Sequence, residues 1–250
     1  VYLGTPIPFA LEREAGRALA FDGPDAFSMA GDRRFPQDRE EQLAAFRKIC
    51  ECPSPGSGDY AELVRRTAAS ALASAEEVKA CLGRGENKAT YPSGQRLALV
   101  ARLIGGGMKT RVYYTAVSGF DTHANQKGAH ANLLGLGAGS IDAFFKDLEA
   151  IGRAQDVVLM AFSEFGRRVA ENGSGGTDHG TAGPVFLVGP GVKGGVHGPA
   201  PDLGDLIDGD PKFAIDFRSV YAAVLRDWLG ADPAVALEGG FSPVPVFAKA

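Results

Sequence analysis

The stretch 110–126, TRVYYTAVSGFDTHANQ, decides the fold. Residues 110–117 are mostly apolar, β-branched or aromatic, which predicts a short strand buried on both faces. The polar residues 118–126 then follow the carboxyl end of that strand, which is where open α/β sheets bind their ligands. Two later apolar runs, DVVLMAF at 156–162 and PVFLV at 184–188, predict two further buried strands.

Helices account for most of the remaining predicted structure. Three- and four-residue spacing of apolar side chains predicts helices at 37–50, 59–82, 93–104, 132–151 and 216–229. Shorter β-like runs precede them at 6–11 and 18–21. This order predicts an α/β fold whose mostly parallel sheet carries helices on both faces, with a helical insertion in the first third. We expect a single α/β domain over 1–250, with a helical part at 37–106 and a sheet core with the site loops at 108–250.

The composition is that of an ordinary soluble globular protein. The chain has 250 residues, of which 45% are hydrophobic and 22% charged. Its net charge of −4 gives no general attraction to nucleic acid or to an anionic membrane. No apolar run reaches the roughly 18 residues that a membrane-spanning helix needs, so we expect no membrane span.

Metal-ligand residue types gather beside the predicted strands. Asp121 and His123 are two residues apart, so an extended backbone points both side chains to the same side. Asp178 and His179 are adjacent and precede the strand at 184–188. Imidazole and carboxylate together favour Zn²⁺, whereas carboxylates alone would favour Mg²⁺, Ca²⁺ or Mn²⁺. These four residues are therefore the predicted metal ligands.

Further polar residues follow the strand at 156–162. Glu164 is a candidate ligand or general base, and Arg167 with Arg168 offers a guanidinium fork for a tetrahedral oxyanion such as phosphate or sulfate. The alternatives are turn and capping hydrogen bonds for the Asp and His residues and surface charges for the two arginines. We expect His130 to face solvent, and His197 either packs within its loop or lies at the rim of the site.

The three cysteines, Cys50, Cys52 and Cys81, form an odd number without metal-site spacing. Two interpretations remain open. Few cysteines are typical of reduced thiols in a cytosolic protein. Alternatively, Cys50 and Cys81 on neighbouring helices form one disulfide, which requires an oxidising compartment.

Three segments carry a resemblance to a known family. They are GFDTHANQ at 119–126, FSEFGRRVAENGSGGTDHGTAGPVFLVGPGVKGG at 162–195 and DFRSVYAAVLRDWLG at 216–230. They resemble the bacterial family called domain of unknown function 1501, whose members are typically exported. The family is grouped with the alkaline-phosphatase-like superfamily of phosphatases, sulfatases and cofactor-independent phosphoglycerate mutases. The resemblance implies that fold and a periplasmic or secreted location.

The resemblance also implies roles for residues. Asp121 and His123 stand where the superfamily has an Asp-x-x-x-His metal pair, and His179 matches its lone late histidine. Ser163 and Glu164 occupy the position of an Asp-His pair, which favours a single or altered metal over two zinc ions. The implied function is metal-dependent hydrolysis of phosphate or sulfate esters, with a small-molecule or glycan ester as substrate. The alternative is a non-catalytic exported binding protein that keeps the fold and a metal or glycan site.

In this superfamily the first strand and the nucleophile belong to a segment that precedes the part resembled here. We therefore expect residues 1–250 alone to have an incomplete sheet and little hydrolase activity. Supplying the preceding segment, fused or as a second chain, should raise both the melting temperature and the ester turnover.

Overall fold

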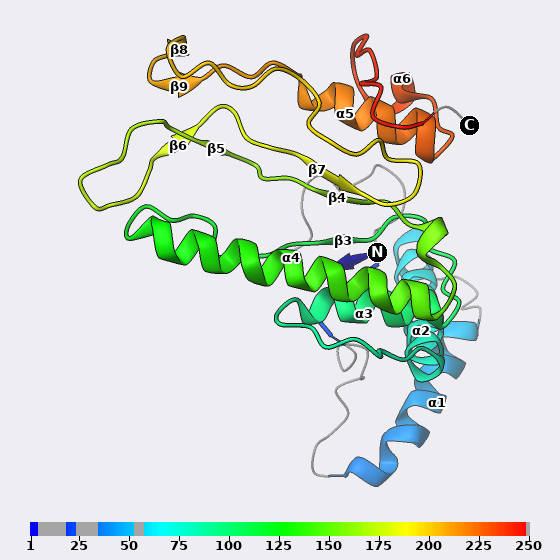
Figure 1. Cartoon of the computed structure of the whole chain (residues 1–250). Helices are drawn as coiled ribbons and strands as arrows, with labels where there is room; N and C mark the ends of the chain where they lie inside the picture. Colours follow the sequence, from blue (N-terminus) through cyan, green and yellow to red (C-terminus); the bar gives the residue numbers. More distant parts are fainter. Residues whose placement is uncertain (5–18, 24–34, 53–57, 249–250) are drawn as a thin grey trace. The chain divides into compact units, whose positions relative to one another are not determined.

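The computed structural model combines helices with short strands, and it describes residues 1–4, 19–23, 35–52 and 58–248 (Figure 1). The chain divides into two compact units. The first unit comprises Val1–Val117 and Leu136–Ile151, and the second comprises Ser118–Gly135 and Gly152–Ala250. The expected mixture of helix and sheet is confirmed, whereas the single domain over 1–250 stays a prediction. The expected β-like run at 6–11 lies outside the described residues.

The first unit contains a parallel sheet of three strands in the order β2-β1-β3. They are β1 (Tyr2–Leu3), β2 (Ala20–Phe21) and β3 (Tyr114–Thr115). Leu3 of the middle strand is fully buried. β3 lies within the predicted strand 110–117, but Val112 and Val117 on either side of it are 51% and 56% exposed. The expected burial on both faces is wrong for this run, because β3 is an outer strand that pairs over only two residues.

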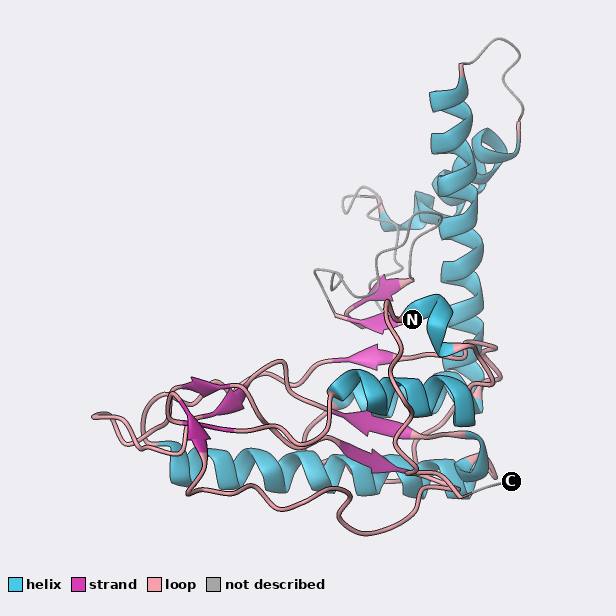
Figure 2. Ribbon diagram, turned by 90° about the horizontal axis from the view of Figure 1, so that it is seen from above, coloured by secondary structure: helices cyan, strands magenta, loops and turns pink. Residues whose placement is uncertain are grey.

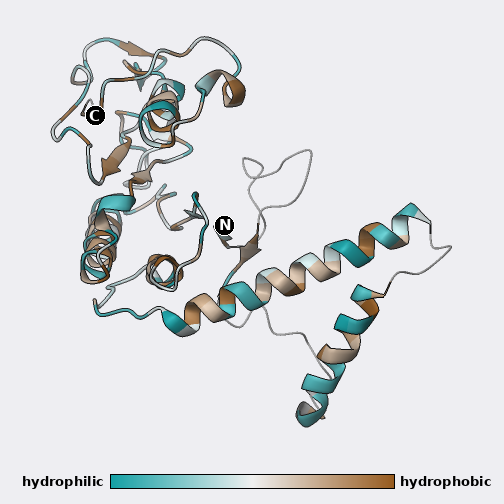
Figure 3. Cartoon of the chain, turned by 90° about the vertical axis from the view of Figure 1, so that its right-hand side faces the viewer, coloured by the Kyte–Doolittle hydropathy of each residue, from teal (hydrophilic) through white to brown (hydrophobic). Residues whose placement is uncertain are grey.

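Three helices follow the patterns predicted for the first unit. After a 3-10 turn, η3 (Pro36–Asp38), they are α1 (Arg39–Glu51), α2 (Asp59–Arg84) and α3 (Gln95–Gly105). Hydrophilic and hydrophobic residues alternate along α2, as the colours in Figure 3 show. Its apolar side buries Val78, Cys81 and Leu82. None of the described helices combines the length and the apolar character needed to cross a bilayer.

The carboxyl end of α2 and that of α3 approach each other closely. A Cβ atom on Gly85 would lie 2.0 Å from the carbonyl oxygen of Arg102, and one on Gly106 would lie 2.0 Å from that of Cys81. Arg84 and Arg102 each donate to backbone carbonyls beyond the other helix end, at 2.7 Å to Gly106 and 3.2 Å to Gly85. The two glycines therefore permit a contact that arginine–carbonyl hydrogen bonds hold.

All three cysteines are free thiols, with Cys50 and Cys81 buried and Cys52 exposed. The carbonyl of Cys50 accepts a hydrogen bond from Arg65 of α2. Arg65 lies 16 positions before Cys81 on the same helix, which corresponds to about 24 Å along the helix axis. A disulfide between Cys50 and Cys81 is therefore absent, because its Cα atoms would have to lie about 4.4–6.8 Å apart.

Helix α4 (Gln126–Ala150) runs through both units, with residues 126–135 in the second and 136–150 in the first. It begins six residues before the predicted start at 132. A hydrogen bond from the backbone N–H of Gln126 to the carbonyl of Gly175 at 2.9 Å fixes this early start. Because that contact joins segments far apart in sequence, periodicity could not indicate it.

The second unit contains three antiparallel strand pairs. They join β4 (Leu159–Ala161) with β7 (Phe186–Val188), β5 (Gly166–Arg167) with β6 (His179–Gly180), and β8 (Leu206–Ile207) with β9 (Asp210–Pro211). A short 3-10 turn, η4 (Ala154–Asp156), precedes them. Figure 2 shows β4 and β7 as neighbouring strands of opposite direction. The strands predicted at 156–162 and 184–188 exist, but they are not parallel neighbours. A parallel pair needs a long crossover, usually a helix, and the β5–β6 pair connects them instead.

The helix predicted at 216–229 is divided into an α-helical part and a π-helical part. α5 (Phe217–Ala223) continues as a π-helical segment, η5 (Val224–Trp228), and a short α6 (Pro233–Ala236) follows. Asp216 caps α5 by accepting from the N–H of Arg218, whose side chain also lowers the pKa of Asp216 to about 2. Ala223, Val246 and Phe247 form a buried cluster here, so the predicted amphipathic helix at 216–229 supports a small core.

Candidate metal site

Three polar side chains converge in the second unit. Asp121 and His123 lie in the 118–126 loop after β3, and His179 begins β6. The Oδ1 atom of Asp121 lies 2.7 Å from Nε2 of His179 and 3.0 Å from Nε2 of His123. The two Nε2 atoms are 3.1 Å apart. Within the part of the chain that the structure describes, this is the one group of His, Cys, Asp or Glu residues arranged to share a metal ion.

An aromatic ring orients His179. The ring of Phe165 stacks on the imidazole with centroids 3.9 Å apart and an angle of 12° between the planes. Phe165 directly precedes β5, and the register of β5 with β6 places Arg167 opposite His179. The hairpin therefore brings Phe165 to the imidazole and limits its rotation. The sequence reasoning missed Phe165, although it stands inside the polar segment 163–168.

A carboxylate lies behind His123. The Nδ1 atom of this imidazole is 3.5 Å from Oδ1 of Asp178, on the opposite side of the ring system from Asp121. Asn172 donates from Nδ2 to the same Asp178 oxygen at 3.2 Å and to the carbonyl of His123 at 3.1 Å. Asp178, a predicted ligand, is thus outside the group of three. The sequence reasoning missed Asn172, whose only local signal is the turn-forming run NGSGG.

Hydrogen bonds keep the two carboxyl groups of the site charged. The bond from His179 is the main cause of the lowered pKa of Asp121; burial opposes it, and nearby positive charge adds to it. The bond from Asn172 is the main cause of the lowered pKa of Asp178. Ionised carboxylate is the form that binds a metal or orients a metal-bound imidazole.

Arg167 directs its guanidinium to the backbone. It donates to the carbonyl of Thr177 at 2.5 Å and to the carbonyl of Phe120 at 2.6 Å. The second nitrogen also lies 3.6 Å from Oδ1 of Asp121. Phe120 and Thr177 flank the ligand-bearing positions, so Arg167 holds the two segments of the site. The guanidinium group of Arg167, which we expected to bind an oxyanion, is therefore hydrogen-bonded to these two carbonyls.

Glu164 and Arg168 lie apart from the three converging side chains. Glu164 is exposed and forms no hydrogen bond or ion pair within the described part of the chain. Arg168 donates to the carbonyl of Asp208 at 2.7 Å and lies 3.4 Å from Asp210, so it supports the turn between β8 and β9. A free carboxylate in the loop between β4 and β5 is therefore the remaining candidate base.

The other two histidines also lie outside the group. His130 is half-buried and meets the edge of Phe120 at 5.6 Å, and its buried Nδ1 has no hydrogen-bond partner among the described residues. The expected solvent-facing position is wrong, because α4 begins early enough to turn this side chain toward Phe120. His197 is exposed and contacts the carbonyl of Lys193 at 2.9 Å, which is packing within its own loop.

Close backbone contact joins the segment around His123 to the segment around His179. A Cβ atom on Gly176 would lie 2.3 Å from the carbonyl carbon of His123, so only glycine fits there. Thr177 donates from its hydroxyl to the side-chain carbonyl of Gln126 at 3.1 Å. These contacts explain why residues so far apart in sequence meet at one point.

The spacing of the three atoms fits one metal ion. Ligand atoms about 2.0–2.1 Å from a tetrahedral Zn²⁺ stand about 3.3 Å from one another. The observed separations among Asp121, His123 and His179 are 2.7, 3.0 and 3.1 Å. A small outward movement of each side chain would therefore accommodate the ion.

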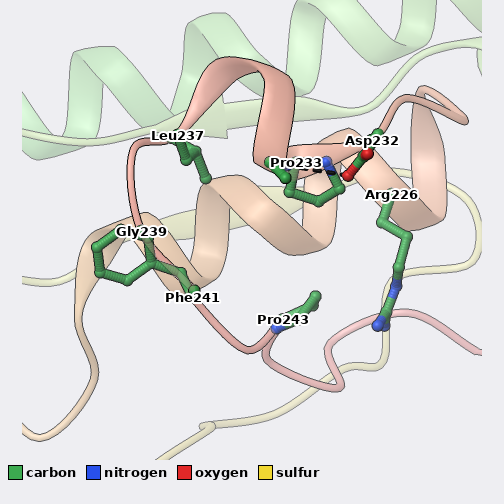
Figure 4. A pocket seen from close by; sticks show the side chains of 9 residues that line it. Arg226, Asp232, Pro233, Leu237, Gly239, Phe241 and Pro243 are labelled. Carbon is green, nitrogen blue, oxygen red and sulfur yellow. Dashed lines mark hydrogen bonds between the residues drawn. The ribbon is translucent and has the colours of Figure 1, made fainter.

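A separate shallow pocket of about 240 Å³ lies near the carboxyl end of the chain (Figure 4). Its walls are mostly apolar, and Figure 4 labels Arg226 and Asp232 among the residues that line it. Arg226 is paired with Asp227 at 2.7 Å, and Asp232 caps α6 through the N–H of Ala234. The charged groups of this pocket are thus already engaged with their neighbours.

Fold and site together define a mixed helix-and-sheet protein with an exposed Asp–His–His cluster. A family model described as "Protein of unknown function (DUF1501)" matches residues 57–229, and the chain belongs to this family. The match includes all three residues of the cluster. Comparisons with curated proteins and with solved structures gave no match.

Proposed function

We propose that the protein binds one divalent metal ion at Asp121, His123 and His179, and that it hydrolyses phosphate or sulfate esters with this metal. The observation that carries the proposal is the triangle of ligand atoms with edges of 2.7, 3.0 and 3.1 Å. Two imidazoles beside one carboxylate favour Zn²⁺ over Ca²⁺ or Mg²⁺, which prefer oxygen ligands.

Exposure of the ligands supports a catalytic metal over a structural one. The side chains of Asp121, His123 and His179 are 62%, 46% and 47% exposed. Catalytic zinc sites use three protein ligands and leave one position for water or substrate, whereas structural sites are closed. A metal bound here would supply a Lewis acid for an ester oxygen and a more acidic water.

Two residues of the chain would supply proton transfer and hold the ligands in position. We propose Glu164, which is exposed and has no ion pair or hydrogen bond among the described residues, as the general base that accepts a proton from water. Arg167 keeps the carbonyls of Phe120 and Thr177 in place and so preserves the spacing of the ligands.

The broader setting is also a proposal. We place the chain in the alkaline-phosphatase-like superfamily, with the parallel sheet β2-β1-β3 as part of a sheet covered by helices, and in the periplasm or outside the cell. Support comes from the motifs at 119–126 and 162–195 and from the parallel pairing of β1 with β2 and β3. The substrate would be a small-molecule or glycan ester.

One observation favours a second candidate function, a non-catalytic exported binding protein. Arg167 is the arginine nearest to Asp121 among the ion pairs of the described residues, and its fork is bound to two carbonyls. An oxyanion at the cluster would therefore lack a guanidinium partner unless Arg167 released them.

Metal content and turnover together test the two candidates. Protein purified without chelator should contain one metal ion per chain, and His123→Ala and His179→Ala should lose it. His197→Ala is the matched control, because His197 lies outside the cluster and should leave metal content unchanged. Turnover of nitrophenyl phosphate or sulfate that disappears in the same two variants supports the hydrolase. Stoichiometric metal without turnover supports the non-catalytic binding protein. Absence of metal uptake contradicts the metal-dependent hydrolase and also a binding protein that acts through a metal.

A further inference from the structure

Asp178 and Asn172 form a second layer behind His123. We infer that Asp178 does not bind the metal but positions His123 so that Nε2 is its ligating atom, and that Asn172 holds both residues in place. The affinity part of this inference rests on the proposed metal site. The part that concerns the imidazole itself does not, and it can be tested in the metal-free protein.

The side chain of Asn172 uses its full hydrogen-bonding capacity. Its Nδ2 donates to the carbonyl of His123 and to Asp178, at 3.1 and 3.2 Å. Its Oδ1 accepts from the backbone N–H groups of Ser174 and Gly176, at 3.0 and 3.1 Å. Acceptors at one end and donors at the other fix the orientation of the amide. Asn172 is thus a clamp that sets the distance between His123 and Asp178.

Asp178 favours the tautomer of His123 that carries its proton on Nδ1. A neutral imidazole carries one proton, and the nitrogen that carries it is set by the partner of that nitrogen. The carboxylate of Asp178 faces Nδ1 at 3.5 Å and favours a proton there. The carboxylate of Asp121 lies 3.0 Å from Nε2 and favours a proton on that atom while no metal is bound, and Nε2 of His179 lies 3.1 Å away. A metal bound to Nε2 would displace that proton, and Asp178 would then hold the remaining proton on Nδ1. A carboxylate that orients a histidine in this way is a common companion of a metal ligand.

A direct ligand role for Asp178 fits the geometry less well. The two ring nitrogens direct their lone pairs away from each other, so a carboxylate oxygen that faces Nδ1 does not face the point shared by the Nε2 atoms. The same oxygen also accepts from Asn172. The pair therefore acts on the metal site through His123.

Two measurements test the inference. The tautomer of His123 is read from long-range ¹H–¹⁵N spectra of the metal-free Asp121→Ala variant, which lacks the competing carboxylate at Nε2. The spectra are recorded at about pH 8.5, well above the ordinary imidazole pKa of about 6.5. This variant should show the proton of His123 on Nδ1, and adding Asp178→Ala should remove this preference. Zn²⁺ affinity is measured by competition with a chromogenic chelator, and Asp178→Ala should weaken it about 10- to 100-fold.

Control variants separate positioning from general damage. Glu171→Ala removes an exposed carboxylate in the same loop and should change neither measurement. Asp178→Asn keeps an acceptor oxygen and should retain most of the tautomer preference. If Asp178→Ala does not fold, Asn172→Ala replaces it and should give a mixture of tautomers with weaker Zn²⁺ binding.

Distinct outcomes overturn the inference and the proposed function. An unchanged tautomer when Asp178→Ala is added to the folded Asp121→Ala variant overturns the inference. So does a loss of Zn²⁺ affinity as large as that of His123→Ala, because it would make Asp178 a ligand. Absence of metal binding by the wild type refutes the proposed function alone, since the tautomer comparison still decides the role of Asp178.

Discussion

At the scale of single residues, Gly176 leaves no room for a side chain beside the site. A methyl group there would meet the carbonyl carbon of His123 at 2.3 Å, so Gly176→Ala must displace the His123 segment. We expect a loss of about 1–3 kcal/mol in the free energy of unfolding, as is typical of overpacking. Zn²⁺ affinity should fall with it.

Gly173 provides the control for this prediction. A Cβ atom on Gly173 has no neighbour within 4 Å, and this glycine belongs to the same loop. Urea denaturation should find Gly173→Ala within about 0.5 kcal/mol of the wild type. Equal effects of the two substitutions would show that loop flexibility, and not the contact with His123, determines the cost.

The same scale shows what the sequence could reveal about the site. Asp121, His123 and His179 were predictable because their residue types follow strands or precede them. The roles of Phe165 and Asn172 were not, because they depend on partners far away in the chain. Asn172 and His123, for example, are 49 positions apart. Residue types therefore predicted the candidate ligands, and only the fold shows which residues lie around them.

At the scale of elements, Asp147 joins α4 to the segment before α3. Its side chain is almost fully buried and accepts four hydrogen bonds, from Asn87, Lys88 N–H, Ala89 N–H and Tyr91, at 2.7–2.8 Å. Burial acts to raise the pKa of Asp147, but these bonds together outweigh it and lower the pKa below the ordinary value. The charged form is thus bound more tightly in the folded state than in the unfolded state.

This difference predicts a dependence of stability on pH. Because the folded pKa is lowered, the contribution of Asp147 is fully present above the unfolded pKa of about 3.9 and is lost as pH falls through the folded value. Asp147→Asn should lower the free energy of unfolding by about 1–3 kcal/mol at pH 7, and the difference should shrink below about pH 4. Asp142→Asn, in an exposed ion pair of the same helix, should cost less than about 1 kcal/mol. A difference constant from pH 7 to pH 3 would contradict this account.

The contact between the ends of α2 and α3 allows a test with two nearby glycines. Gly85→Ala would place a methyl group 2.0 Å from the carbonyl oxygen of Arg102, whereas a methyl on Gly83 meets nothing within 4 Å. We expect Gly85→Ala to destabilise the protein by about 1–3 kcal/mol. Gly83→Ala lies inside α2 and should be neutral or stabilise by up to about 1 kcal/mol. Thermal unfolding of both variants measures the two effects. If both substitutions destabilise the protein equally, the close contact with the Arg102 carbonyl is not the cause of the loss.

Helices were easier to predict than strands in this chain. α1, α2 and α3 follow long periodic patterns whose signal accumulates over many residues. The run at 110–117 predicted a strand of eight residues, but only Tyr114–Thr115 pair. Pairing direction was also beyond the sequence pattern, because it depends on how the chain returns between β4 and β7. Local periodicity therefore predicts helices well and leaves strand partners open.

At the scale of the whole molecule, α4 is one continuous helix that contributes to both compact units. Helix formation is cooperative along the chain, so a change in the stability of residues 126–135 should also affect residues 136–150. The candidate metal site lies in the second unit, whereas Cys50 and Cys81 are buried in the first. We therefore expect Zn²⁺ to protect these thiols, although neither is part of the site.

Thiol reactivity measures this coupling. In a Cys52→Ser variant, which removes the exposed thiol, a colorimetric thiol reagent should react with two thiols only as the first unit opens. Zn²⁺ at 100 times its Kd stabilises the folded site by about 2.7 kcal/mol, which is about 100-fold in the population that opens. Full coupling through α4 would slow the reaction by that factor, and partial coupling by less. The same experiment with His179→Ala should show no protection by Zn²⁺. If Zn²⁺ binds the Cys52→Ser protein but leaves the thiol rates unchanged, the two units unfold independently and α4 does not transmit the stability of the site.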